Sequence, residues 1–116
     1  MANAMRSEEE TMVTLRPDGR RGVIMSTRTY DSLSTFILTS LDTTVDLTLN
    51  DVLEKAQLKF SDTIENVAWC TLQVKLDLEA RGWIKVVEPV YQKRLFFIKL
   101  TRQGSKKIRT ENSFQE

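Results

Sequence analysis

Histidine is absent from this 116-residue sequence, and cysteine occurs only once, at Cys70. Without histidine, a Ser-His-Asp triad, a histidine acid–base pair and the common Cys/His metal clusters are excluded. The single cysteine excludes an internal disulfide, and its apolar neighbours predict a buried, inert thiol. Only four glycines occur, and none belongs to a phosphate-binding string. We therefore expect no enzymatic activity, no cofactor and no metal.

Long apolar runs are also missing, so no segment is predicted to span a bilayer, and residues 1–10 lack the apolar core of a signal peptide. The 41% hydrophobic and 28% charged content is typical of a soluble globular domain. A chain of this length usually forms one domain around one core. We expect a cytoplasmic protein with no membrane partner.

The formal net charge of +1 conceals an uneven distribution of charge along the chain. Residues 31–82 contain nine acidic and four basic side chains, whereas residues 83–116 contain eight basic and three acidic ones. The folded molecule should therefore be electrically polar. The acidic middle of one copy could meet the basic end of another, so a homodimer is possible.

The chain divides into four predicted segments. Residues 1–11 are expected to be a disordered N-terminus or the remnant of an expression tag. Residues 12–28 are predicted to form an arm or hairpin, because runs rich in Val, Ile and Met flank the turn Arg16-Pro17-Asp18-Gly19. Residues 29–110 form the main domain, and 111–116 are expected to be a disordered tail.

Apolar residues recur at helical spacing in three stretches of the main domain. The predicted elements are helix one over 29–41, a short strand over 45–47, helix two over 49–60 and helix three over 64–81. Thr48 is the expected cap of helix two, with Asp51 in its first turn. An Asp62-x-x-Glu65 arrangement resembles a capping box for helix three, and Gly82 supplies a left-handed stop.

Two β-rich runs follow helix three and predict a hairpin with a loop over 89–94. Alternation at every second position gives it an inner apolar face consisting of Ile84, Val86, Phe96, Ile98 and Leu100. Its outer face is apolar too, at Trp83, Val87, Leu95 and Phe97, and such a patch is unusual in water. We expect the arm to cover it by adding a strand, with a second subunit as the alternative. Thr101 is expected to cap a short basic helix that ends at Arg109.

Two motifs carry a family resemblance: Leu78-Glu79-Ala80-Arg81-Gly82-Trp83-Ile84 and Leu100-Thr101-Arg102-Gln103-Gly104. With the order of elements, they make the chain similar to winged helix-turn-helix regulators of the MarR and PadR type over residues 29–109. The resemblance implies a mostly α fold with a small antiparallel β wing (α+β), a three-helix core plus a β-hairpin. It also implies DNA binding, a role in transcription regulation and a dimer. In such proteins helix three enters the major groove and the wing touches phosphates.

The candidate DNA-binding residues fall into three groups, which are Gln92, Lys93 and Arg94 at the wing tip, Asn66, Gln73 and Lys75 on helix three, and Arg20, Arg21 and Arg28 in the arm. Basic side chains can neutralise phosphates, amide side chains can read adenine, and an arginine-rich arm can enter a minor groove. Ordinary solvated surface charge is the alternative for the wing tip and for the arm.

Helix three does not have the composition of a base-reading helix. Its carboxylates outnumber its cations, and we expect all of them to be solvated on exposed helix faces. Trp69 is expected to be a core residue. The alternative function is therefore a protein-interaction winged helix without DNA binding, whose interface includes Trp83, Val87, Leu95 and Phe97. A small-molecule ligand is neither predicted nor excluded.

Overall fold

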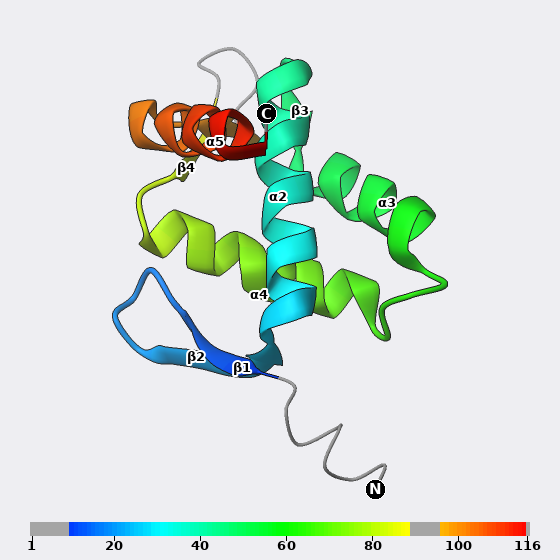
Figure 1. Ribbon diagram of the computed structural model, residues 1–116. Helices are drawn as coiled ribbons and strands as arrows, with labels where there is room; N and C mark the ends of the chain where they lie inside the picture. Colours follow the sequence, from blue (N-terminus) through cyan, green and yellow to red (C-terminus); the bar gives the residue numbers. More distant parts are fainter. Residues whose placement is uncertain (1–9, 89–95, 116) are drawn as a thin grey trace, which may run out of the picture.

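A computed structural model describes residues 10–88 and 96–115, with side chains through Thr110 (Figure 1). The strands β1 to β5 cover Thr11–Leu15, Arg21–Ser26, Leu47–Thr48, Ile84–Val87 and Phe97–Leu100. The helices α2 to α5 cover Thr27–Thr43, Leu49–Phe60, Val67–Ala80 and Arg102–Gln115. The fold is therefore α+β, with mostly helical content and small antiparallel sheets, which confirms the predicted class at that level.

The strands form two separate antiparallel sheets. β1 and β2 make a hairpin, and β3, β5 and β4 make a three-stranded sheet in that order. In the second sheet Ile84 pairs with Leu100 and Val86 with Ile98. Because cross-strand partners share a face, these four side chains lie on one face, as the alternation predicted, but Val86 is 38% exposed rather than packed in the core. Phe96 does not follow the prediction: it precedes the paired part of β5, and its side chain is 51% exposed.

The core lies around α2, which crosses the middle of the molecule in Figure 1. Fully buried side chains reach it from every part of the main domain, namely Leu33 and Ile37 of α2, Val52 of α3, Val74 and Leu78 of α4, and Ile84 and Ile98 of the sheet. At about 25 cal/mol per Å² of apolar area removed from water, these side chains supply most of the stabilisation of a domain this small.

Local capping signals set the start of α2 and α3. The Ser26 side chain accepts a hydrogen bond from the Thr29 N–H at 3.4 Å, which caps α2. Thr48 and Asp51 form a reciprocal capping box: the Thr48 hydroxyl accepts from the Asp51 N–H, and the Asp51 carboxylate accepts from the Thr48 N–H. Chiefly because of that backbone bond, the pKa of Asp51 is lowered.

The predicted start of helix three was wrong. Residues 61–65 form a turn in which the Phe60 carbonyl accepts from the Thr63 and Ile64 N–H groups, so the Asp62-x-x-Glu65 motif is no capping box. The helix, α4, starts only at Val67, after Asn66 in a left-handed conformation with φ 54°. Asparagine tolerates this conformation better than most residues, so it ends the turn and directs the chain into α4.

At the C-terminal end, α5 continues to Gln115, beyond Arg109, where the sequence predicted its end. The segment 111–116, predicted to be a disordered tail, is therefore helical through Gln115. After Gly104 no glycine and no proline interrupts the sequence, so no residue forces the helix to stop.

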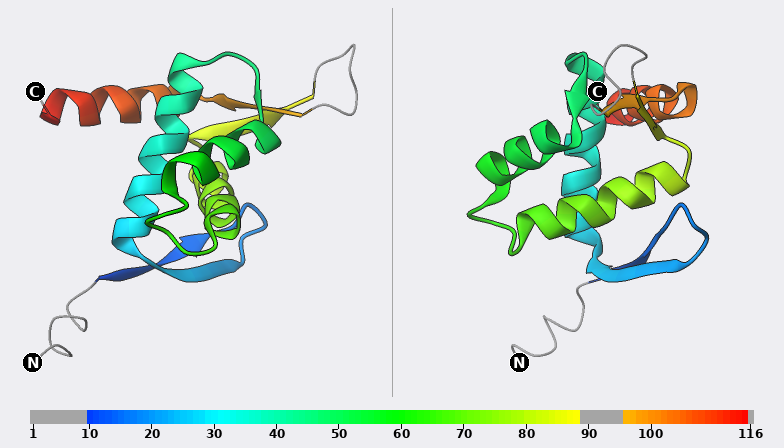
Figure 2. Two further views of the ribbon diagram at one scale, coloured as in Figure 1. Left: turned by 90° about the vertical axis from the view of Figure 1, so that its right-hand side faces the viewer. Right: turned by 180° about the vertical axis from the view of Figure 1, so that it is seen from behind.

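The hairpin β1–β2 does not cover the outer face of the three-stranded sheet, contrary to our expectation. It lies on the opposite side of α4 from that sheet (Figure 2). Its backbone is fixed to α4 by a 2.8 Å hydrogen bond from the Leu15 N–H to the Asp77 carboxylate, and Met25 is buried in the core. The edge of the sheet is extended by β3, because Leu47 and Thr48 pair with Ile98 and Phe97.

Candidate functional site

The wing tip, with the predicted DNA contacts Gln92, Lys93 and Arg94 and the predicted interface residue Leu95, lies outside the described residues. The strands leading to it, β4 and β5, project from the body of the domain in Figure 2.

On α4 the three predicted base-reading residues do not form one surface. Asn66 and Gln73 are seven residues apart, close to two helical turns, and so lie on the same side of the helix. Lys75 is about 200° around the helix from Gln73 and pairs with Glu79 at 2.8 Å. Only Asn66 and Gln73 thus remain as neighbouring candidates for reading a base.

The outward side of α4 is apolar instead. Trp69, predicted to lie in the core, is 48% exposed, and Leu72 and Leu76 are partly exposed one and two turns further along. The helical periodicity that predicted a buried tryptophan holds for Val67, Thr71 and Val74, whereas Trp69 points the other way. Cys70 is half-buried, and burial raises the pKa of its thiol.

The arginines of the N-terminal segment are exposed, but they belong to a folded hairpin rather than to a flexible arm. Arg20 and Arg21 lie where the turn enters β2, and Arg28 lies in the first turn of α2. Arg16 in the same turn pairs with Asp18 at 3.0 Å. Arg20 and Arg21 form no ion pair with the described carboxylates.

A second group of cations, which we did not select from the sequence, lies on α5. Arg102, Lys106 and Arg109 are all exposed, and their spacing of four and three residues aligns them on one side of the helix. That spacing is visible in the sequence and was the signal available for finding them. In Figure 1 the β1–β2 turn, the end of α4 and α5 lie to the left of α2 and α3 lies to the right, whereas the left view of Figure 2 places α5 and the β1–β2 turn on opposite sides of α2.

Of the predicted apolar interface on the outer face of the sheet, the three described side chains do not form one patch. Val87 and Phe97 are cross-strand partners and half-buried, and the neighbouring pair on the same face is Lys85 with Lys99. Trp83 does not join them. It precedes β4 and packs against the hydrophobic core beside α5.

Backbone hydrogen bonds hold Trp83 in this place. Gly82, at φ 80°, ends α4 in the left-handed conformation, and the Trp83 N–H then donates back to the Leu78 carbonyl. The Trp83 carbonyl accepts from Thr101 at 3.0 Å, at the start of α5. At Gly104 a Cβ atom would lie 2.0 Å from the Trp83 carbonyl oxygen, so only glycine permits this approach.

Asp77 is the most connected polar side chain of the domain, and it is fully buried, although we expected the carboxylates of this helix to be solvated. Its Oδ1 accepts from the Leu15 N–H at 2.8 Å. Its Oδ2 accepts from the Tyr30 hydroxyl and, at 2.7 Å, from the Arg81 Nε. One carboxylate therefore joins the hairpin, α2 and the end of α4.

The Asp77 cluster changes the protonation of its neighbours. Burial, and next the hydrogen bond to Asp77, raise the pKa of Tyr30 well above its ordinary value of 10. The hydrogen bond to Asp77 also raises the pKa of Arg81, so the guanidinium is charged at every accessible pH. Tyr30 is a neutral donor and Arg81 a permanent cation under physiological conditions.

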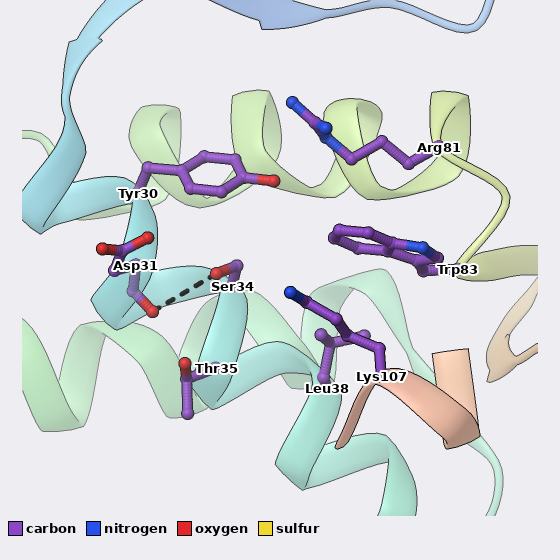
Figure 3. A pocket seen from close by; sticks show the side chains of 8 residues that line it. All are labelled: Tyr30, Asp31, Ser34, Thr35, Leu38, Arg81, Trp83 and Lys107. Atoms are coloured by element: carbon purple, nitrogen blue, oxygen red, sulfur yellow. Dashed lines mark hydrogen bonds between the residues drawn. The ribbon is translucent and has the colours of Figure 1, made fainter. Parts of the chain in front are cut away.

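A cavity of about 440 Å³ opens between α2, the end of α4 and α5 (Figure 3). We call it the α2/α5 pocket. Its lining includes the rings of Tyr30 and Trp83, and the side chains of Arg81 and Lys107. The Arg81 guanidinium carbon is 5.5 Å and the Lys107 Nζ 5.0 Å from the centroid of the Trp83 ring. Cations at these distances interact favourably with an indole ring.

Two further properties bear on the kind of site. None of the described helices is long and apolar enough to cross a membrane. The described part of the chain contains no group of three or more Cys, Asp or Glu side chains able to hold a metal ion. The α2/α5 pocket and the exposed basic side chains both offer cationic groups that can bind an anion.

Comparison with known protein families shows a match to a family described as "Family of unknown function (DUF6958)" over residues 11–95. The match includes the β1–β2 hairpin, all three helices from α2 to α4, and both Arg81 and Trp83. No curated protein and no solved structure matches the chain. Since the match spans well over half of the sequence, the chain belongs to the DUF6958 family, whose function is unknown.

Proposed function

We propose that the chain is a winged helix domain that binds duplex DNA, mainly through phosphate contacts, as a DNA-associated regulator. The order helix, strand, helix, helix, strand, strand from α2 to β5 supports the winged helix interpretation. The sheet order β3-β5-β4 supports it as well, since the first strand pairs with the last strand of the hairpin.

The observation that carries DNA binding is the presence of two groups of exposed cations that form no ion pair with the described carboxylates. They are Arg20 and Arg21 beside the β1–β2 turn and Arg102, Lys106 and Arg109 on α5, and we call them the basic residues. In Figure 1 the turn between α3 and α4, with the exposed carboxylates Asp62 and Glu65, lies away from both groups. A molecule with this charge separation is oriented by a polyanion before contact, and its arginines neutralise phosphates after contact.

The side chains on α4 favour contacts that position the domain on DNA over contacts that read its bases. Only Gln73 and Asn66 offer paired donors and acceptors there, and Lys75 is held by Glu79. We therefore expect affinity that depends steeply on salt and weakly on sequence, because phosphate contacts carry no sequence information.

The test is fluorescence anisotropy with a labelled random-sequence duplex at roughly 50 mM and 200 mM salt. Two double variants, Arg20→Gln with Arg21→Gln and Arg102→Gln with Arg109→Gln, should each reduce affinity and lower the salt slope by up to about 2. Lys55→Gln with Lys59→Gln removes two exposed cations from α3 and is the matched control. No binding at the lower salt, or double variants that behave like the control, would reject the proposal.

A second candidate function is self-association through the outward side of α4. It is favoured by Trp69, which is 48% exposed and lies beside the partly exposed Leu72 and Leu76 on the same side of the helix. Half-exposed aromatic residues are enriched at protein interfaces. Analytical ultracentrifugation of the wild type and of Trp69→Gln tests it: a mass of 13.4 kDa at all concentrations for the wild type would exclude this candidate.

A further inference from the structure

The face of the β1–β2 hairpin that points away from the core is apolar. Met12 pairs with Met25, which is buried in the core, so the next pair along the strands, Val13 with Ile24, lies on the opposite face. Val13 is 38% exposed and Ile24 69% exposed, and Leu15 at the end of β1 is 42% exposed. The hairpin therefore presents aliphatic side chains to solvent.

This face lies next to the exposed side of α4. The edge of the hairpin meets α4 at Asp77, whose carboxylate accepts from the Leu15 N–H. Trp69 and Leu76 lie about 80° and 100° around the helix from Asp77, on the side away from the buried Val74. In the right view of Figure 2, α4 and the hairpin lie side by side in front of α2. We call the exposed apolar side chains of the two elements the α4–hairpin surface, which consists of Val13, Leu15, Ile24, Trp69, Leu72 and Leu76.

The size of the α4–hairpin surface suits a protein partner. At roughly 150 to 250 Å² for a fully exposed large side chain, the exposed fractions of its four most accessible members correspond to about 400 Å². Each partner of a standard dimer interface contributes about 800 Å², of which a little over half is apolar. The α4–hairpin surface thus supplies most of the apolar area that one partner of a stable dimer needs.

Exposed charges of opposite sign lie at the two ends of α4. Asp62 and Glu65 belong to the turn before the helix, and Arg20 and Arg21 lie beside the β1–β2 turn. None of these four side chains forms an ion pair within the described residues. In the right view of Figure 2 the hairpin lies below the C-terminal half of α4, and the turn between α3 and α4 lies at the other end of the helix. Since α4 has 14 residues, about 21 Å separate its two ends.

We propose that two copies of the chain associate through the α4–hairpin surface, about a two-fold axis that makes their α4 helices antiparallel. Trp69 of one copy then lies opposite Leu76 of the other, and Leu72 lies close to the axis. This inference rests on the second candidate function, self-association through α4, and specifies its geometry. It also adds the hairpin to the interface.

Charge complementarity selects the antiparallel arrangement. It places Asp62 and Glu65 of one copy beside Arg20 and Arg21 of the other, and the symmetry forms this contact twice. A parallel arrangement of the helices would bring the two acidic turns together instead. Like charges at an interface cost several kcal/mol, so the parallel dimer is disfavoured.

Reversing the charges tests the arrangement by analytical ultracentrifugation. Arg20→Glu with Arg21→Glu, and separately Asp62→Lys with Glu65→Lys, each place like charges at both contacts of a homodimer. We expect a Kd of about 10 µM for the wild type and at least tenfold weaker association for each reversed chain. An equimolar mixture of the two reversed chains, one of them fluorescently labelled, again has opposite charges at both contacts. It should form a heterodimer with a Kd within about threefold of the wild-type value.

Two controls separate this effect from misfolding. Lys55→Glu with Lys59→Glu reverses two exposed cations on α3 and should dimerise like the wild type, and thermal unfolding shows whether each chain retains its fold. A measurement that needs no variant is the salt dependence. Raising the salt from roughly 50 to 500 mM should weaken the wild-type dimer several-fold, because exposed charge pairs are screened.

Three results would overturn the proposal: a wild-type mass of 13.4 kDa at all concentrations, reversed chains that associate as well as the wild type, or a mixture that stays monomeric. A wild-type dimer that Trp69→Gln dissociates but neither reversal weakens would overturn this arrangement alone and leave self-association through α4 in place. No DNA is present in these measurements, so the DNA-binding proposal succeeds or fails separately.

Discussion

Replacing Asp77 with asparagine should destabilise the domain more than any other isosteric substitution on α4. The wild-type carboxylate is fully buried and accepts hydrogen bonds from the Leu15 N–H, the Tyr30 hydroxyl and the Arg81 Nε. An asparagine keeps one acceptor oxygen and places an amide NH₂ against groups that are themselves donors. Arg81 then loses its counter-ion while it stays partly buried, with 32% of its side chain exposed.

The expected loss in the free energy of unfolding follows from the ion pair between Asp77 and Arg81, which the substitution breaks. Removing one partner of a buried ion pair costs about 3 to 5 kcal/mol, and the partial exposure of Arg81 moves the expectation to the lower end, about 3 kcal/mol. Urea unfolding followed by tryptophan fluorescence measures it, with an unchanged m-value as the check on two-state behaviour. Tyr30→Phe removes one hydrogen bond to the same carboxylate and should cost about 1.5 to 3 kcal/mol. A loss below about 1 kcal/mol for Asp77→Asn would refute the assignment of Asp77 as the central polar contact of the fold.

Three further predictions concern single contacts. The pKa of Tyr30 is raised in the folded state above its ordinary value of 10. Its contribution to the free energy of unfolding is therefore complete below pH 10 and is lost as the pH rises further. Urea unfolding across that pH range should show this loss in the wild type and not in Tyr30→Phe. The Thr71 hydroxyl is buried with no hydrogen-bond partner among the described residues, so Thr71→Val should raise the free energy of unfolding by about 1 kcal/mol, and a lower midpoint would contradict this. Gly104→Ala would stabilise an ordinary helix, but here its Cβ meets the Trp83 carbonyl oxygen at 2.0 Å, so thermal unfolding should show a loss of more than about 2 kcal/mol rather than a gain.

The elements that could be predicted from the sequence depend on neighbours within a few residues. The Thr48 cap with Asp51, the left-handed Gly82 and the pairing face of Ile84 and Val86 are all present in the structure. Each is determined by a side chain that bonds to nearby backbone, by a backbone angle or by strand alternation. Such signals are readable without knowledge of the tertiary fold.

The predictions failed where contacts between segments distant in the sequence determine the position of a side chain. Trp83 has the alternation of an outward strand residue, but α5 approaches its carbonyl group at Gly104 and places the Lys107 Nζ 5.0 Å from the centroid of its ring. Trp69 has helical spacing compatible with a core position, but the core takes the other side of α4. The β-prone residues of the hairpin correctly predicted its two strands. Their own sequence does not indicate whether the hairpin packs on the three-stranded sheet or on α4.

Asp77 was the most consequential error, and it changes the interpretation of the hairpin. The spacing of Asp77 and Arg81 suggests only a surface ion pair on a helix, worth a few tenths of a kcal/mol. Burial by α2 and β1 makes it a contact on which the fold depends, because without the Leu15 N–H one oxygen of a buried carboxylate would lose its partner. The hairpin is therefore an integral part of the domain rather than a mobile arm. Arg20 and Arg21 are presented from a turn whose position is fixed, so any phosphate they contact is bound without the entropy loss of ordering a flexible segment.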